Sequence, residues 1–281
     1  MASFAAQIAA VTAMNVKNVP SRWGASMVIV IGIAGVVGVL IALLSMARGF
    51  QATLASTGRA DRAVLLRGGA NDELSSVIMR EQVDVVRQAP GVKKDAQGQP
   101  MALPEVYLLS GLPRRGGSEP SNVVVRGTEA RVLEVRPEIR IVEGRMFTPG
   151  LREVVVGRGA QAQFANLNLG DHAAIRNGDW AVVGIFESGG DVHESEVLAD
   201  LETLMSAAHR PVPTSMVVQL EDAAAFTRFK DALTADPRMS VKVLREPDYY
   251  SSRSEQLGAF INYLGYTVAV IMAIGALFGA L

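Results

Sequence analysis

The sequence predicts an α+β membrane protein in which two transmembrane helices bracket a large aqueous domain. Residues 25–47 and 257–281 contain no ionised side chain. Each run is long enough to cross the roughly 30 Å hydrocarbon core of a bilayer as a helix. Between them, short apolar runs alternate with turn residues and helical patterns, which is typical of a mixed domain.

The composition of the middle part, residues 48–256, excludes some functions. It holds all 28 acidic residues and all but Lys17 and Arg22 of the 27 basic ones, so its net charge is slightly negative. A nucleic-acid platform would be basic. The absence of cysteine excludes disulfides and thiolate chemistry, and it is compatible with a bacterial domain outside the cytoplasm.

The amino-terminal residues 1–24 are expected to form a short amphipathic helix on the cytoplasmic membrane surface. Phe4, Ile8 and Val11 share one helical face. Arg22 and Trp23 then suit the headgroup region as interfacial anchors. A frayed amino terminus is the alternative.

Residues 25–47 are expected to form the first transmembrane helix. Basic residues lie on both sides of this run, so they do not settle its orientation. Cleavage as a signal peptide after Ala47 is the alternative, but signal peptides have apolar regions of only about 7 to 15 residues. Residues 48–57 could extend the helix outward as a stalk.

The first lobe of the aqueous domain is expected in residues 48–127. Asn71 or Asp72 can cap a helix that carries Leu74 and ends at Pro90. Strands are expected at residues 63–67, 101–110 and 121–127.

Residues 128–213 are expected to form a β-rich lobe inserted into the first one. Strands at 173–176 and 180–186 flank Asn177-Gly178, a strong hairpin signal. Another strand at 153–157 precedes a short helix at 160–165. The remaining part, residues 214–256, returns to a strand, a helix carrying Phe229 and a strand, and then a second stalk leads to the membrane.

Residues 257–281 are expected to form the second transmembrane helix, and this helix is expected to be truncated because no charged residue closes it. Both spans contain small residues that permit close helix packing. These candidate helix-packing residues are Gly32, Gly35, Gly38, Ala269, Ala273, Gly275 and Gly279.

No catalytic, cofactor-binding or metal-binding residue is assigned from the sequence. Gly157-Arg158-Gly159 superficially resembles a phosphate loop, but the chain has no nucleotide-binding motif and this segment is interpreted as a turn. His172 and His209 are interpreted as surface or satisfied core residues. One acidic segment offers a weak metal hypothesis, although a solvated acidic loop is the favoured interpretation; its residues are Asp191, His193, Glu194, Glu196 and Asp200.

The chain resembles the MacB-like and FtsX-like permeases of ABC transporters, a family that includes the lipoprotein-releasing LolC and LolE proteins. The resemblance starts from residues 271–281, preceded by Tyr249-Tyr250 and Ser254-Glu255. It extends in order over nearly the whole chain, through residues 143–147, 153–158, 169–171, 180–186 and 194–196 with Asp200.

The resemblance implies a multi-pass protein of the bacterial inner membrane with four spans in each subunit. The periplasmic domain would have a discontinuous porter-like lobe, residues 48–127 and 214–256, and a sabre-like lobe, residues 128–213. The subunit would be non-catalytic and bind no cofactor, because a separate cytoplasmic ATPase binds ATP. A second permease subunit, identical or not, and a periplasmic adaptor or outer-membrane component are the further expected partners.

The favoured hypothesis is a permease that converts ATP-driven dimer closure into movement of its periplasmic domain, exporting or releasing a hydrophobic or peptide-like substrate. A two-span sensory receptor with a periplasmic ligand-binding domain is the alternative. A membrane-anchored enzyme that uses the acidic segment is a third. The sequence identifies neither the substrate nor the direction of transport, and residues that contact an ATPase would lie beyond Leu281.

Overall fold

The computed structural model describes residues 4–18, 23–55, 57–117, 119–176 and 178–280. They fall into two units. The helical unit comprises Met1–Ala52 and Ser254–Leu281, and the α/β unit comprises Thr53–Arg253. Asn177 of the predicted turn and the predicted anchor Arg22 both lie outside the described residues.

Three helices contribute to the helical unit: α1 (Phe4–Asn18), α2 (Trp23–Ala55) and α8 (Glu246–Ala280). The first apolar helix was predicted to continue beyond residue 47, and this is confirmed because α2 extends to Ala55. The second stalk is also helical, but α8 begins earlier than predicted. Pro247 suits the first turn of a helix, where the missing N–H would have no partner within the helix. The negative charges of Glu246 and Asp248 stabilise this turn because they lie at the positive end of the helix dipole.

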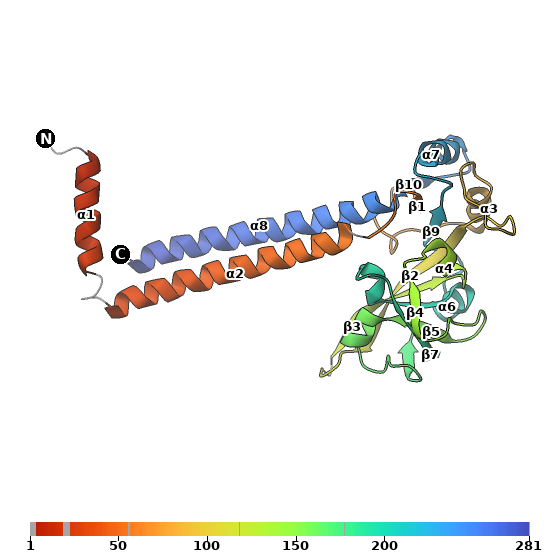
Figure 1. Ribbon diagram of the computed structural model, residues 1–281, viewed down its shortest axis with the longest axis horizontal. Coiled ribbons are helices and arrows are strands. Elements are labelled where there is room, and N and C mark those ends of the chain that lie inside the picture. The colour runs from red at the N-terminus through yellow and green to blue at the C-terminus, as the bar shows by residue number, and fades with distance from the viewer. Residues whose placement is uncertain (1–3, 19–22, 56, 118, 177, 281) are drawn as a thin grey trace. The chain divides into compact units, whose positions relative to one another are not determined.

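Within the helical unit, α2 and α8 run side by side (Figure 1), and Leu40 Cδ1 lies 3.4 Å from the Cβ position of Gly265. Among the described helices, Val30–Gly49 is the stretch that is long and apolar enough to cross a membrane, with a mean hydropathy of 2.6. Gly258–Met272 of α8 is a shorter apolar stretch. The second span therefore stays a prediction.

The α/β unit is built on one mixed sheet with the strand order β10-β1-β9-β2-β3-β8-β5-β7-β4, and β6 pairs with β7. The β3–β8 and β5–β7 pairs are parallel, and the other pairs are antiparallel. The strands are β1 (Arg62–Arg67), β2 (Ala102–Pro113), β3 (Pro120–Thr128), β4 (Arg140–Gly144), β5 (Glu153–Gly157), β6 (His172–Ile175), β7 (Gly178–Glu187), β8 (Glu196–Asp200), β9 (Ser215–Gln219) and β10 (Val241–Arg245).

One end of the sheet interleaves two strand-helix-strand pieces that are distant in the sequence. Strand β9 lies between β1 and β2, and β1 lies between β9 and β10. Helices α3 (Arg80–Arg87) and α7 (Ala225–Ala235) cover this end in Figure 1. Their residues Val86 and Phe229 share a core with Leu65 of β1, whereas Val64 faces the opposite side towards Tyr249 and Tyr250 of α8. Because β1 is buried on both faces, its sequence is a continuous apolar run.

The predicted helix start at Asn71 or Asp72 is wrong, because α3 begins only at Arg80. The Asp72 carboxylate accepts a bond from Ser75 N at 2.8 Å, but the chain does not continue as a helix. Ser76 Oγ instead accepts a bond from Arg67 N at 2.8 Å, and Glu73 is buried. These tertiary contacts outweigh the local helical pattern.

The other end of the sheet contains β3 to β8 with α4 (Val132–Val135), α5 (Arg158–Gln163), α6 (Leu201–Ala207) and the 3-10 helix η2 (Val192–Ser195). The long strand β2 joins the two ends, because residues 102–105 pair with β9 and residues 106–113 pair with β3. Val154 and Val156 face one core, and Val155 faces another. The division into lobes at residues 127 and 213 stays a prediction.

Gly184 of β7 is a position where only glycine fits. A Cβ atom there would lie 2.2 Å from Arg145 O, a backbone atom that cannot rotate away. Gly184→Ala is expected to lower the free energy of unfolding by about 1–3 kcal/mol, as overpacking does elsewhere. Gly111→Ala is the matched strand control, because its Cβ would meet only Pro120 Cβ at an ordinary 3.5 Å. Equal urea midpoints for the two variants would contradict this packing argument.

Candidate functional site: a buried charge network at the start of α8

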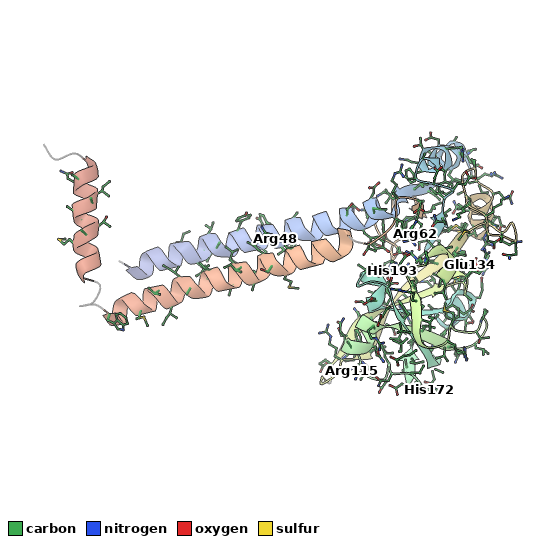
Figure 2. All side chains as sticks on the ribbon, viewed as in Figure 1. Arg48, Arg62, Arg115, Glu134, His172 and His193 are labelled. Carbon is green, nitrogen blue, oxygen red and sulfur yellow. The ribbon has the colours of Figure 1, made fainter. Side chains whose placement is uncertain are left out.

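A network of charged side chains lies inside the α/β unit, next to the first turns of α8. Its members come from β1, β2, β3, β8, α8 and two loops, and each has a side chain that is at most 6% exposed. Figure 2 labels one member, Arg62, and shows His172 well away from it. The buried charge network consists of Arg62, Glu73, Glu105, Arg126, Arg136, Glu196 and Glu246.

Arg126 of β3 binds three carboxylates at once. Its Nε and Nη2 donate to the two carboxylate oxygens of Glu196 at 2.7 and 2.9 Å. Its Nη1 donates to Glu73 Oε1 and Glu105 Oε2, both at 2.7 Å. The guanidinium also stacks over the Tyr107 ring, 5.1 Å from its centroid. Arg126 thereby joins the two ends of the sheet through charge-assisted bonds.

Glu246, the first residue of α8, binds two buried arginines. Arg62 Nε donates to Glu246 Oε2 at 2.6 Å, and Arg136 Nη1 donates to Glu246 Oε1. Arg59 N also donates to Glu246 Oε2, at 3.0 Å. Arg62 in turn donates to Val135 O at 2.8 Å. The start of α8 is therefore fixed to strand β1 and to the α4 region.

Two tyrosines of α8 extend this attachment. Tyr249 Oη donates to Glu73 Oε2 at 3.1 Å. Tyr250 Oη lies 3.1 Å from His193 Nε2, and His193 Nδ1 lies 3.0 Å from Asp191 Oδ2. All of these residues lie within the α/β unit.

Two members of the network, Glu246 and Arg126, have pKa values that favour their charged forms despite burial. Burial alone would raise the pKa of Glu246, but the guanidinium groups of Arg136 and Arg62 outweigh it and lower that pKa. Burial alone would lower the pKa of Arg126, but the carboxylates of Glu196, Glu73 and Glu105 raise it well above its ordinary value. Burial raises the pKa of Tyr250 well above its ordinary value, so this hydroxyl stays protonated.

The lowered pKa of Glu246 predicts a loss of stability in acid. A carboxyl group with a depressed folded-state pKa stabilises the fold above its unfolded-state pKa, and this contribution is lost as the pH falls through the folded-state pKa. The difference in unfolding free energy between wild type and Glu246→Gln should therefore be largest near pH 7. It should begin to shrink as the pH approaches the ordinary value of 4.5. Urea titrations of both proteins between pH 7 and pH 3 measure this difference, and a constant difference would contradict the assignment.

The arrangement favours a structural role over a catalytic one. Every carboxylate of the network accepts bonds from arginine, so none is held free to act as a base. Among the residues that the structure describes, no group of three or more potential ligands is placed to hold a metal ion. Breaking one buried pair leaves an uncompensated charge, which costs about 3–5 kcal/mol. The network can therefore hold the first turns of α8 firmly in place.

The solvated-loop interpretation of the acidic segment is wrong. Asp191 caps η2, His193 is buried, and Glu196 and Asp200 begin and end the buried strand β8. The pattern misleads because Arg126 compensates Glu196, and Asp200 accepts a bond from Thr203 N at 3.1 Å. The metal hypothesis gains no support from the described side chains.

Other residues singled out in the sequence have varied outcomes. His172 and His209 lie on the surface as predicted, and His172 Nδ1 lies 2.8 Å from exposed Asp179. The turn interpretation of Gly157-Arg158-Gly159 is wrong, because Gly157 ends β5 and α5 begins directly at Arg158. Trp23 is exposed, and its role as an interfacial anchor stays a prediction.

The candidate helix-packing residues stay predictions. Apart from the adjacent backbone of the same helix, no described atom lies within 4 Å of the Cβ positions of Gly32, Gly35, Gly38 or Gly275. The side chain of Ala273 and residue Gly279 lie outside the side chains that the structure describes.

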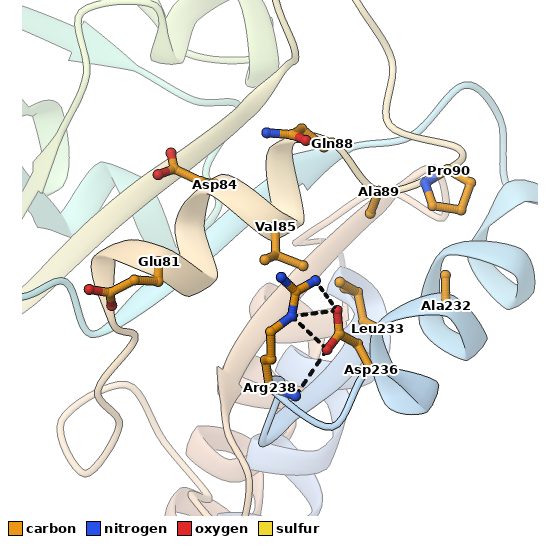
Figure 3. Close-up of a pocket in the computed structure, with 10 residues that line it drawn as sticks. All are labelled: Glu81, Asp84, Val85, Gln88, Ala89, Pro90, Ala232, Leu233, Asp236 and Arg238. Atoms are coloured by element: carbon orange, nitrogen blue, oxygen red, sulfur yellow. Dashed lines mark hydrogen bonds and ion pairs between the residues drawn. The ribbon is translucent and has the colours of Figure 1, made fainter.

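One surface hollow of the α/β unit lies between α3 and α7 (Figure 3). It has a volume of about 520 Å³ and is lined by Glu81, Asp84, Val85, Gln88, Ala89, Pro90, Ala232, Leu233, Asp236 and Arg238. Asp236 binds Arg238 at 2.6 Å, and hydrogen bonds from Arg238 lower the Asp236 pKa to about 2. The hollow presents no convergent set of catalytic groups.

The chain is similar to known proteins in both sequence and fold. Residues 26–236 match the sequence model of the MacB-like periplasmic core domain. The extracellular domain of the noncanonic ABC-type transporter YknZ from Gram-positive bacteria is similar in fold, with a TM-score of 0.50 and 16% identity over 65% of this chain and 99% of that one. The periplasmic region of MacB from Actinobacillus actinomycetemcomitans has a TM-score of 0.50 and 14% identity over 66% and 89% of the two chains. No curated protein sequence matches the chain.

Proposed function

Because the chain belongs to the MacB-like and FtsX-like family of ABC transporter permeases, we propose that it is a membrane subunit that transmits ATP-driven movement to its periplasmic domain. Residues 25–47 and 257–281 are its transmembrane segments, and residues 48–256 are its periplasmic domain. ATP is hydrolysed by a separate cytoplasmic subunit. The family match does not favour the sensory-receptor alternative.

The observation that carries this proposal is the attachment of α8 to the buried charge network. Helix α8 runs without interruption from Glu246 to Ala280, so one helix contains both the network's carboxylate and the proposed second span. A continuous helix is stiff along its axis, and the network holds its first turn to β1 and the α4 region. Displacement of the membrane end would therefore be passed to the sheet.

A second permease subunit is the proposed partner of the small-residue faces. Gly32, Gly35 and Gly38 have no close neighbour in the described chain, and lipid alone does not require such a stripe. Helices of a second subunit, or further helices of the full-length protein, would cover it. The transported substrate is proposed to be hydrophobic or peptide-like.

The proposed topology can be tested with single cysteines, because the chain has none of its own. Ser240→Cys lies at an exposed position of the α/β unit, and Gln7→Cys lies at an exposed position of α1. In intact spheroplasts, a membrane-impermeant maleimide should label Ser240→Cys and should label Gln7→Cys only after permeabilisation. The reverse pattern would reject the topology.

The proposed coupling is tested with the full-length protein. Affinity purification in mild detergent should recover an ABC ATPase, and ATP with vanadate should change the distance between spin labels at Ser240→Cys in two copies of the permease. Glu246→Gln should weaken this response. Recovery of a histidine kinase in place of an ATPase would support the receptor alternative and reject the proposal.

A further inference from the structure

The segment around η2 contacts α8 on one side and the β-rich end of the sheet on the other. We propose that η2 carries a displacement of the first turns of α8 to the junction between β5 and α5. This inference rests on the proposed function, because it takes α8 as the moving element.

The contact with α8 is both polar and apolar. Tyr250 Oη lies 3.1 Å from His193 Nε2, and the two rings meet edge to face with centroids 5.9 Å apart. Val192 packs against the cluster that contains Tyr249 and Tyr250, and Val192 N donates to Thr57 Oγ1 at 3.4 Å. A shift of the first turns of α8 must therefore move η2 or break these contacts.

Hydrogen bonds within the η2 segment hold its residues together. The Asp191 carboxylate accepts bonds from His193 N at 2.9 Å and faces His193 Nδ1 at 3.0 Å. The Glu194 carboxylate accepts bonds from Ser188 N and Gly190 N, both at 2.8 Å. These carboxylates therefore tie η2 to the turn that precedes it, so that residues 188–194 are held together.

On its other side, the backbone of η2 lies very close to two glycines, Gly157 and Gly159. A Cβ atom at Gly157 would lie 2.2 Å from Glu194 O, and one at Gly159 would lie 2.9 Å from the same oxygen. Gly157 has an ordinary φ of −66°, so its glycine is required by this close approach and not by its backbone conformation. This contact accounts for the Gly157-Arg158-Gly159 motif.

The junction is connected onward to the edge of the sheet. Arg158, between the two glycines, binds Glu143 of β4 at 2.7 Å and Glu187 of β7 at 3.2 Å. A displacement of η2 would therefore act on β5, and through Arg158 on β4 and β7. Coupling between the Tyr250–His193 contact and the junction of β5 with α5 is an energetic property, so it is measured by changing one site and observing the other.

The test is hydrogen exchange measured by mass spectrometry on the intact chain in lipid nanodiscs. Tyr250→Phe removes the hydroxyl that faces His193 and keeps the ring. Loss of this bond should speed exchange about fivefold in peptides that cover residues 191–196 and residues 158–164, because one net hydrogen bond changes an opening equilibrium by about that factor. Tyr263→Phe is the control on the same helix, since the Tyr263 side chain is exposed, and it should change neither peptide.

Faster exchange in residues 191–196 without any change in residues 158–164 would overturn the proposal. A uniform increase over the whole α/β unit would overturn it as well, because it would indicate global opening. These readouts need neither ATPase nor substrate, so a negative result leaves the proposed transport function standing, and failure to recover an ATPase leaves this coupling standing.

The reverse experiment starts from the junction and covers the case in which Tyr250→Phe does not fold. Gly157→Ala should push Glu194 away, and by reciprocity it should perturb the contact between His193 and Tyr250. The chain has only three histidines, so the imidazole ¹⁵N resonances can be assigned with His172→Gln and His209→Gln. A shifted His193 signal supports the coupling, and an unchanged signal overturns it.

Discussion

Replacement of Arg126 by methionine is expected to lower the free energy of unfolding of the α/β unit by about 3–5 kcal/mol. The arginine is the shared partner of Glu73, Glu105 and Glu196, whose side chains are almost fully buried. Methionine fills much of the volume but leaves these carboxylates without a cation. Burying an unpaired charge is among the most costly single changes that a protein core can undergo.

Urea unfolding of the chain in detergent measures this effect through the fluorescence of Trp180. Trp180 is fully buried in the α/β unit, and Trp23→Phe removes the other tryptophan of the chain. Arg80→Met is the matched control, because Arg80 and its partner Glu202 are 60% and 62% exposed. Exposed pairs are screened by water and contribute little to stability, so the control should unfold close to wild type.

A combined variant separates charge from packing. Arg126→Met together with Glu73→Gln, Glu105→Gln and Glu196→Gln removes the cation and all three negative charges. Replacement of whole buried ion networks by neutral groups is often tolerated, so this variant should recover most of the lost stability. If it stays as unstable as Arg126→Met alone, the loss arises from packing or unsatisfied hydrogen bonds and not from uncompensated charge.

Local patterns predicted the strands whose sequences are continuous apolar runs. Residues 63–67 and 153–157 coincide with β1 and β5, because β-branched and apolar runs of this length suit buried strands. Strand β8 was missed, since Glu196 and Asp200 at its two ends resemble a polar loop. The interleaving of β9 between β1 and β2 depends on pairing between segments more than 100 residues apart, which no local pattern contains.

The buried charge network could not be predicted for the same reason. Its members lie between Arg62 and Glu246, and each one alone looks like an ordinary surface residue. One signal was present: Arg126 directly follows the apolar residues Val123–Val125 within β3, and Glu105 lies within the apolar run of β2. A charge inside such a run needs a partner, but the partner is identified only when the sheet order is known.

Glu246→Gln is expected to lower the free energy of unfolding by about 3 kcal/mol and to loosen the start of α8. The substitution keeps the shape of the side chain but removes the charge that faces Arg62 and Arg136. Arg62 still forms an ion pair with Glu138, and Arg136 still forms one with Glu105 at 3.8 Å. The expected loss of unfolding free energy therefore lies towards the lower end of the range for broken buried pairs. Urea unfolding gives the magnitude, with Glu202→Gln as the exposed control.

The two consequences of this substitution can be separated by a third variant. Arg62→Met, Arg136→Met and Glu246→Met together replace the ion cluster by apolar groups, which should restore much of the unfolding free energy lost in Glu246→Gln. The directional bonds from Glu246 to β1 and to the α4 region would still be missing. Hydrogen exchange in the first turn of α8 should then remain faster than in wild type even though global stability has recovered. Wild-type exchange in this turn would show that apolar packing of Tyr249 and Tyr250 holds α8 without the ion pairs, and the charge network would lose its proposed role in transmission.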